Sequence, residues 1–286
     1  MTNHTTSLNT SEPKYRKKLN KEQIAVLHLL YKFRFASSEQ IAAYQEKPSS
    51  KSIQKRLKIL EDQGFIAKRY DKSYKLKGKP AAYYLLPKGA REVPARTDRA
   101  EDEPINVKSI YKDKDVSESF IQHCLNILDI YLTLRTPQSS TLSFYTKSDL
   151  KYEHYEYFPQ PLPDLYIRLK TEEGEKEFFL DVFENNQPFF VLIRRIKRYL
   201  EYAGSGEWPN EILPIILLVV ESPSVHRRLR KRILRELQES YEDIVFATTS
   251  LNSLFNPDRK DEEWFLVDGD PSTVNEPQRT FGLARL

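Results

Sequence analysis

The longest apolar run of the sequence limits the folds that this chain can adopt. It covers residues 212–220 (ILPIILLVV) and contains Pro214. Nine residues are too few to cross a bilayer, whereas a continuous apolar run of this length is typical of a strand buried on both faces. Residues 189–202 before it and 225–239 after it have apolar residues at helical spacing. We therefore expect a central strand in an α/β domain with a mixed sheet.

The predicted elements of this α/β domain begin with an amphipathic helix near residues 117–135. Alternating and apolar patterns then predict strands and helices in the order strand, strand, strand, helix, strand, helix, strand. They lie at residues 141–145, 164–169, 177–183, 189–202, 212–220, 225–239 and 243–248, with a last strand at residues 264–267.

Composition excludes several classes of protein. The chain has 286 residues, of which only 8 are glycine, and neither a dinucleotide-binding fingerprint nor a P-loop can be written from them. One cysteine, Cys124, excludes intramolecular disulfides and multi-cysteine metal sites. The polar N-terminus has no apolar segment of a secretory signal. We expect a cytoplasmic protein that does not contact a membrane.

Charge is distributed unevenly along the chain. Residues 14–92 contain 20 Lys or Arg and 7 Asp or Glu, a net charge of +13, whereas residues 93–286 have a net charge of −8. A basic N-terminal segment followed by an acidic remainder of the chain indicates a polyanionic partner for the basic segment. Nucleic acid is the usual partner of this kind.

The basic part has the element order of a winged helix-turn-helix. Apolar spacing predicts a helix from Leu19, a second helix capped by Ser37 and Gln40, and a third that ends at Gly64. Strands at residues 65–70 and 81–86 then form a hairpin with a long basic tip. The predicted organisation is a disordered tail at 1–13, a winged-helix DNA-binding domain at 14–92, a linker at 93–115, an α/β domain at 116–270 and a C-terminal tail at 271–286.

The third helix and the hairpin tip supply the candidate DNA-binding residues. Basic and amide side chains on the polar face of this helix are the types that contact phosphates and base edges in a major groove. Two alternatives remain: a solvated basic face, and a winged helix that binds another protein. The candidates are Lys51, Ser52, Gln54, Lys55, Arg56 and Lys58 on the helix, and Lys68, Arg69, Lys72, Lys75, Lys77 and Lys79 on the hairpin.

Several short runs resemble the replication-relaxation family of plasmids and other mobile elements. The resemblance implies a DNA-binding protein of a mobile element, acting in replication, mobilisation or transcriptional control, with a second domain similar to the restriction-endonuclease-like PD-(D/E)xK fold. It spans most of residues 19–202. The matching runs are 56–66, 84–89, 123–127 (HCLNI), 163–164, 178–181 (FFLD) and 195–202.

An active nuclease of that fold needs two acids that hold Mg²⁺ and a lysine nearby. Asp164 and Asp181 fit the two acids and are the metal candidates, and Glu118 fits an acid on the preceding helix. Phe183 occupies the lysine position, so Lys197 on the next helix is the candidate replacement, while Glu184 is expected to point away by strand alternation. Three interpretations stay open: a domain without catalysis and without a cofactor, an active Mg²⁺-dependent DNA endonuclease, and acids that only solvate strand ends.

Two further features have more than one interpretation. The run at residues 226–232 (HRRLRKR) is basic within an acidic domain, and it is either a second phosphate contact, a partner surface or a solvated helix face. His123 is expected to be a hydrogen-bonded core residue rather than a ligand or base. Duplex DNA is the expected partner, with a homodimer or other replication or mobilisation proteins as further possibilities.

Overall fold

The computed structural model describes most of both predicted domains. The predicted tails and residues 94–109 of the predicted linker lie outside the described residues. Among the helices of the described part, none has the length and apolar character needed to span a bilayer. The described ranges are 18–93, 110–135, 142–150, 156–171, 174–185, 187–210, 212–240, 242–256 and 264–268.

The N-terminal unit combines short helices with a small antiparallel sheet. Its strands are in the order β1-β3-β2. The predicted capping box is present, because the Ser37 hydroxyl accepts the Gln40 N–H and the Gln40 side chain accepts the Ser37 N–H. Gly64 follows α3 with φ +71°, a left-handed conformation that suits glycine. The elements are α1 (Lys21–Phe33), β1 (Phe35–Ala36), α2 (Ser38–Tyr44), α3 (Lys51–Asp62), β2 (Ile66–Arg69), α4 (Lys72–Leu76), β3 (Ala82–Leu85) and α5 (Pro87–Ala90).

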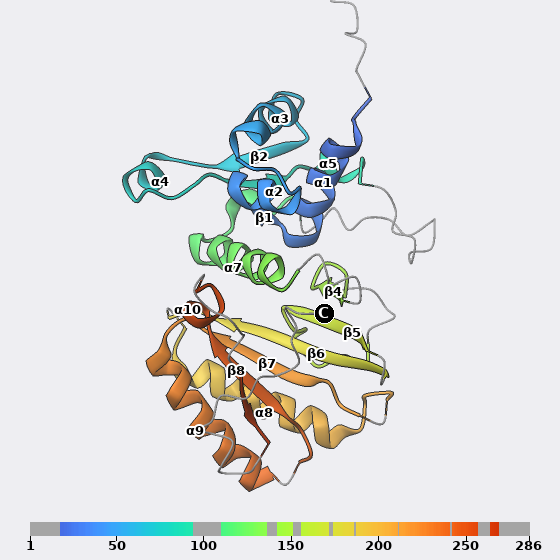
Figure 1. Ribbon diagram of the computed structural model, residues 1–286, viewed down its shortest axis with the longest axis vertical. Coiled ribbons are helices and arrows are strands. Elements are labelled where there is room, and N and C mark those ends of the chain that lie inside the picture. Colours follow the sequence, from blue (N-terminus) through green and yellow to red (C-terminus); the bar gives the residue numbers. More distant parts are fainter. Residues whose placement is uncertain are drawn as a thin grey trace, which may run out of the picture.

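The hairpin tip, residues 70–81, contains a short helix that the sequence patterns did not predict. Asp71 caps α4 by accepting the backbone N–H groups of Ser73 and Tyr74. Tyr74 is buried, whereas Leu76 is 87% exposed. The tip is therefore an ordered projection rather than an irregular loop (Figure 1).

The C-terminal unit is a mixed α/β fold, as predicted. Its six strands are in the order β4-β5-β6-β7-β8-β9, with β6, β7 and β8 parallel and the other pairs antiparallel. The apolar run forms β7, an interior strand that is buried from Ile216 to Val220. The strands are β4 (Leu142–Thr146), β5 (Leu165–Thr171), β6 (Gly174–Phe183), β7 (Ile215–Val220), β8 (Phe246–Ser250) and β9 (Phe265–Val267), and the helices are η1 (Asp113–Asp115), α7 (Glu118–Leu134), α8 (Phe189–Ser205), α9 (Pro223–Ser240) and α10 (Leu251–Leu254).

Helix α7 joins the two units. It lies between the N-terminal helices and one face of the large sheet, and α8 and α9 cover the other face (Figure 1). The buried apolar residues of α1, α7 and that sheet face form one continuous cluster. The Gln40 side chain also donates to the Leu125 carbonyl at 2.9 Å and to the Asp129 carboxylate at 2.7 Å. Apolar burial and these polar contacts therefore fix the N-terminal unit on the sheet unit.

Candidate functional site

The two predicted acids come together at neighbouring ends of two interior strands of the large sheet, β5 and β6. Asp181 is in β6, and Asp164 directly precedes β5, which pairs with β6 in antiparallel register. The backbone N–H of Asp164 donates to Asp181 Oδ1 at 3.2 Å, and the N–H of Val182 donates to Asp164 Oδ2 at 2.8 Å. Sheet pairing thus positions both carboxylates through main-chain hydrogen bonds.

Asp164 is nearly fully buried and has two cationic partners. Its Oδ1 accepts from Lys147 Nζ at 2.6 Å and lies 3.0 Å from His123 Nε2. Lys147 is in the turn after β4, and His123 is on α7. Residues far apart in the sequence therefore converge on one carboxylate.

Asp181 is buried against α8. Its Oδ2 accepts from Arg195 Nε at 2.6 Å and from the Tyr199 hydroxyl at 2.8 Å. Arg195 also donates to the Pro161 carbonyl at 2.5 Å and to the Tyr199 oxygen at 2.8 Å. This guanidinium is therefore held on several sides.

Glu184 completes the cluster, contrary to the expectation that it points away. Its Oε1 lies 2.8 Å from His123 Nδ1. Strand alternation does not apply to it, because β6 ends at Phe183 and the chain leaves the sheet there. His123 is therefore bonded to a carboxylate at each ring nitrogen, in agreement with its prediction as a hydrogen-bonded core residue.

The cluster has balanced charge, and we refer to it as the ion cluster. It comprises the carboxylates of Asp164, Asp181 and Glu184 and the cations of Lys147, His123 and Arg195. Burial alone would lower the pKa of His123, but hydrogen bonds and charge interactions with its two carboxylates raise it to about 10. Burial alone would raise the pKa of Asp164, but Lys147 and His123 hold it below its usual range. Asp164 therefore stays ionised beside its two cations.

The ion cluster does not fit a Mg²⁺ site. Such a site needs carboxylate oxygens directed at the cation and a surplus of negative charge. Here, protein N–H and O–H groups occupy the oxygens of Asp164 and Asp181, and Lys147, His123 and Arg195 balance the charge. Among the residues that the structure describes, no group of three or more His, Cys, Asp or Glu is arranged to hold a metal.

Two other predicted catalytic residues lie away from the acids. Lys197 faces α9, where its Nζ is 3.7 Å from the buried Glu236, because a residue two positions after Arg195 points to another side of the helix. Glu118 accepts from the Tyr74 hydroxyl at 2.5 Å and from Lys79 Nζ at 3.0 Å. The expectation that Lys197 replaces the missing lysine is thus corrected, because the lysine beside Asp164 is Lys147.

Most candidate DNA-binding residues form an exposed basic surface. Helix α3 buries Ile53, Leu57 and Leu60 and exposes the opposite side. No ion pair is formed by the exposed lysines of α3 and of the hairpin tip within the described residues. The exposed residues are Lys51, Ser52, Gln54, Lys55 and Lys58 on α3 and Lys72, Lys75 and Lys77 on the tip.

The other four candidates are engaged within the protein. Arg56 pairs with Glu22 and donates to Gln45 Oε1 at 2.7 Å. Lys68 pairs with Glu61 at 3.0 Å. Lys79 is bound to Glu118, and Arg69 donates to the carbonyls of residues 114 and 116 at 2.9 and 3.1 Å. These side chains position the basic surface and are less available to a ligand than the exposed lysines.

Sequence reasoning missed part of the ion cluster. His123 lies in the run 123–127, and Arg195 and Tyr199 lie in the run 195–202, both of which carried the family resemblance. Those runs were therefore a usable signal. Lys147 and Glu184 had no comparable signal, because a turn and a strand end place them.

Fold and site together define a class of protein: a helical, basic N-terminal unit fixed through α7 to a mixed α/β unit with a buried, charge-balanced acid pair. The sequence pattern of the replication-relaxation family matches residues 27–214, more than half of the chain. The chain belongs to this family.

Other comparisons add little. No curated protein matches the sequence. Two solved structures of restriction endonuclease FokI, one of them bound to DNA, align with 84% of this chain and 45% of theirs. Their identities are 13% and 11%, with TM-scores of 0.28 and 0.31. The chain spans less than half the length of those chains.

Proposed function

We propose that this chain is a duplex DNA-binding protein of a mobile element, acting in its replication, mobilisation or transcriptional control. The observation that carries the proposal is the exposed row of Lys51, Lys55 and Lys58 on α3, which has no acidic partner in the described residues. Unpaired cations on one helix face neutralise phosphates, and Gln54 among them is a side chain that can read a base edge.

The arrangement of the N-terminal unit supports a winged helix-turn-helix. Helices α2 and α3 follow one another, and β2 and β3 form the hairpin beside them. Helix α3 lies on the side of the N-terminal unit away from the large sheet, and the hairpin tip with α4 projects sideways from that unit (Figure 1). In this mode, α3 enters the major groove and the lysines of the tip contact the neighbouring backbone.

The C-terminal unit has a supporting rather than a catalytic role in this proposal. Its acid pair is engaged by Lys147, His123 and Arg195, so these carboxylates stabilise the fold at the edge of the sheet. This unit then positions the DNA-binding unit or assembles it with other copies or with replication or mobilisation proteins.

Salt-dependent binding of a labelled duplex tests the DNA-binding role. Fluorescence anisotropy of Lys51→Gln/Lys55→Gln should show weaker binding and a log–log salt slope reduced by about 0.9 for each phosphate that is no longer neutralised. The matched control is Lys170→Gln/Lys176→Gln, which removes the same charge from the β5–β6 hairpin. An unchanged slope in the α3 variant, or no salt-sensitive binding by the wild type, would refute the assignment and favour a protein-binding winged helix.

Plasmid nicking tests the supporting role. Supercoiled plasmid incubated with the protein and Mg²⁺ or Mn²⁺ should be retarded but stay intact. Nicking that Asp181→Asn abolishes would instead make the chain a metal-dependent endonuclease, with Lys147 as the lysine beside the acids.

A further inference from the structure

The second basic run of the sequence lies on α9, beside α8. The two helices run side by side, because the Arg228 guanidinium lies 4.0 Å from the Phe189 ring centroid near their beginnings and Lys197 meets Glu236 farther along. Both helices start near the carboxyl ends of β6 and β7, at the edge of the sheet that holds Asp181. The two helices therefore share one surface.

That surface collects exposed cations from both helices, and we call it the arginine surface. Within the described part of the chain, none of its members has an acidic partner. The guanidinium of Arg194 lies 5.6 Å from the ring centroid of Phe190, which is 56% exposed. The members are Arg194, Arg198, Arg227, Arg228, Lys231 and Arg235.

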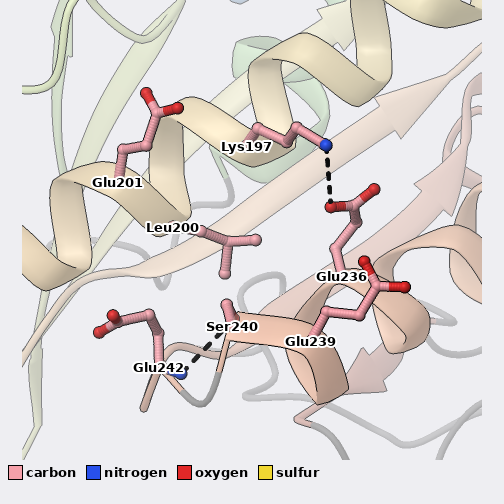
Figure 2. Close-up of a pocket in the computed structure, with 7 residues that line it drawn as sticks. All are labelled: Lys197, Leu200, Glu201, Glu236, Glu239, Ser240 and Glu242. Atoms are coloured by element: carbon pink, nitrogen blue, oxygen red, sulfur yellow. Dashed lines mark hydrogen bonds and ion pairs between the residues drawn. The ribbon is translucent and has the colours of Figure 1, made fainter.

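All the acids of the two helices, Glu201, Glu236 and Glu239, lie in their second halves. A cavity of about 320 Å³ lies between them and is lined by Glu201, Glu236, Glu239 and Glu242, with Lys197 at its basic end (Figure 2). Lys197 is the one basic residue among those lining it, and it faces Glu236. The first halves of the two helices therefore contain no acid, whereas the second halves contain Arg198, Arg232 and Arg235 as well as the acids.

The helix macrodipole does not stabilise this distribution of charge. The start of a helix has partial positive charge and its end has partial negative charge, so acids are favourable at the start and bases at the end. Neither α8 nor α9 has an acid in its first turn or a base in its last turn. A bound anion would be attracted by the cations and by the helix starts.

We infer that the arginine surface is a second phosphate-binding surface for duplex DNA. Lys and Arg clustered on one face are the electrostatic footprint of a nucleic-acid-binding protein. Helices α8 and α9, which carry this surface, lie apart from α3, across the layer formed by α7 and the sheet (Figure 1). A long duplex that passes both regions, or a second duplex, supplies the phosphates.

The test compares two charge-matched variants on a duplex of about 40 base pairs. In Arg227→Gln/Lys231→Gln, which removes two cations one turn apart, the salt slope should fall by about 1.8 relative to the wild type. The control Lys170→Gln/Lys176→Gln should keep the wild-type slope. Circular dichroism checks that both variants stay folded.

Adding the α3 substitutions separates this inference from the proposed DNA-binding role of α3. If α3 does not bind DNA, Lys51→Gln/Lys55→Gln has no effect, yet Arg227→Gln/Lys231→Gln still lowers the slope. If the arginine surface does not bind DNA, the α3 variant loses affinity and the arginine variant keeps the wild-type slope, which overturns the inference. Loss of binding to anionic lipid vesicles, with DNA binding unchanged, also overturns it.

Discussion

The guanidinium of Arg195 lies 2.6 Å from the carboxylate of Asp181, and both side chains are at most 8% exposed. Taking this pair out of water costs free energy, which its geometry and its further hydrogen bonds to Tyr199 and the Pro161 carbonyl offset. The pair fixes α8 on β6. It also occupies the carboxylate oxygen that a metal site would require.

Removal of Arg195 should therefore destabilise the protein strongly. Arg195→Met leaves the Asp181 carboxylate buried beside only neutral donors, and we expect the free energy of unfolding to fall by about 3–5 kcal/mol. Urea denaturation followed by circular dichroism measures the change.

Adding Asp181→Asn to Arg195→Met should recover part of this loss, because it removes the uncompensated charge and keeps an acceptor for the Asp164 N–H. Arg195→Lys is the conservative comparison, and it should cost less than Arg195→Met. A cost below about 1 kcal/mol for Arg195→Met would show that the pair does not stabilise α8.

His123 should make the stability of the protein fall in mildly alkaline solution. Its pKa is about 10 in the folded state, above the ordinary value of about 6.5. The contribution of protonated His123 to the free energy of unfolding is therefore complete below about pH 6.5 and is lost as the pH rises toward 10. Between pH 7 and 9, the free energy of unfolding should decrease by about 1.4 kcal/mol per pH unit from this group.

The variant His123→Gln tests this assignment. Glutamine retains a hydrogen-bonding amide but has no titrating proton, so urea denaturation at pH 7, 8 and 9 should give a flatter profile. Equal slopes for the variant and the wild type would mean that another group causes the dependence.

Local patterns predicted much of the fold. Apolar spacing located α3 from Ile53, Leu57 and Leu60, and the unbroken run located β7. The family resemblance had singled out Asp164 and Asp181 as a pair, and the pairing of β5 with β6 brings them together. These features depend on residues that are close in the sequence or on one strand pairing.

The partners of the acids could not be predicted in the same way. Lys147, His123 and Arg195 come from a turn and two helices, and the packing of those helices on the sheet decides which side chain reaches which oxygen. Strand alternation failed for Glu184 because β6 ends one residue earlier. Helix α4 was missed because a five-residue helix has too short an apolar pattern, although Asp71 is a suitable cap.

Glu118 should fix the hairpin tip. It accepts hydrogen bonds from Tyr74 and Lys79, on both sides of the exposed end of the tip. In Glu118→Ala, trypsin should cleave after Lys72, Lys75 or Lys77 faster than in the wild type, because local opening of α4 becomes easier. Glu175→Ala, which removes an exposed acid on the β5–β6 hairpin, is the matched control. Equal cleavage rates in all three proteins would contradict the role of Glu118.

Neighbouring basic residues of α3 should have separable roles. Lys55 is exposed, whereas Arg56 is half-buried and bound to Glu22 and Gln45. Lys55→Ala should reduce the salt slope of duplex binding by about 0.9 and leave the Tm unchanged, because a surface lysine contributes little to folding. Arg56→Ala should lower the Tm and keep the slope, because the interaction that it removes is within the protein. A reversed pattern, with Arg56→Ala changing the slope at constant Tm, would mean that Arg56 leaves Glu22 to bind phosphate when DNA is present.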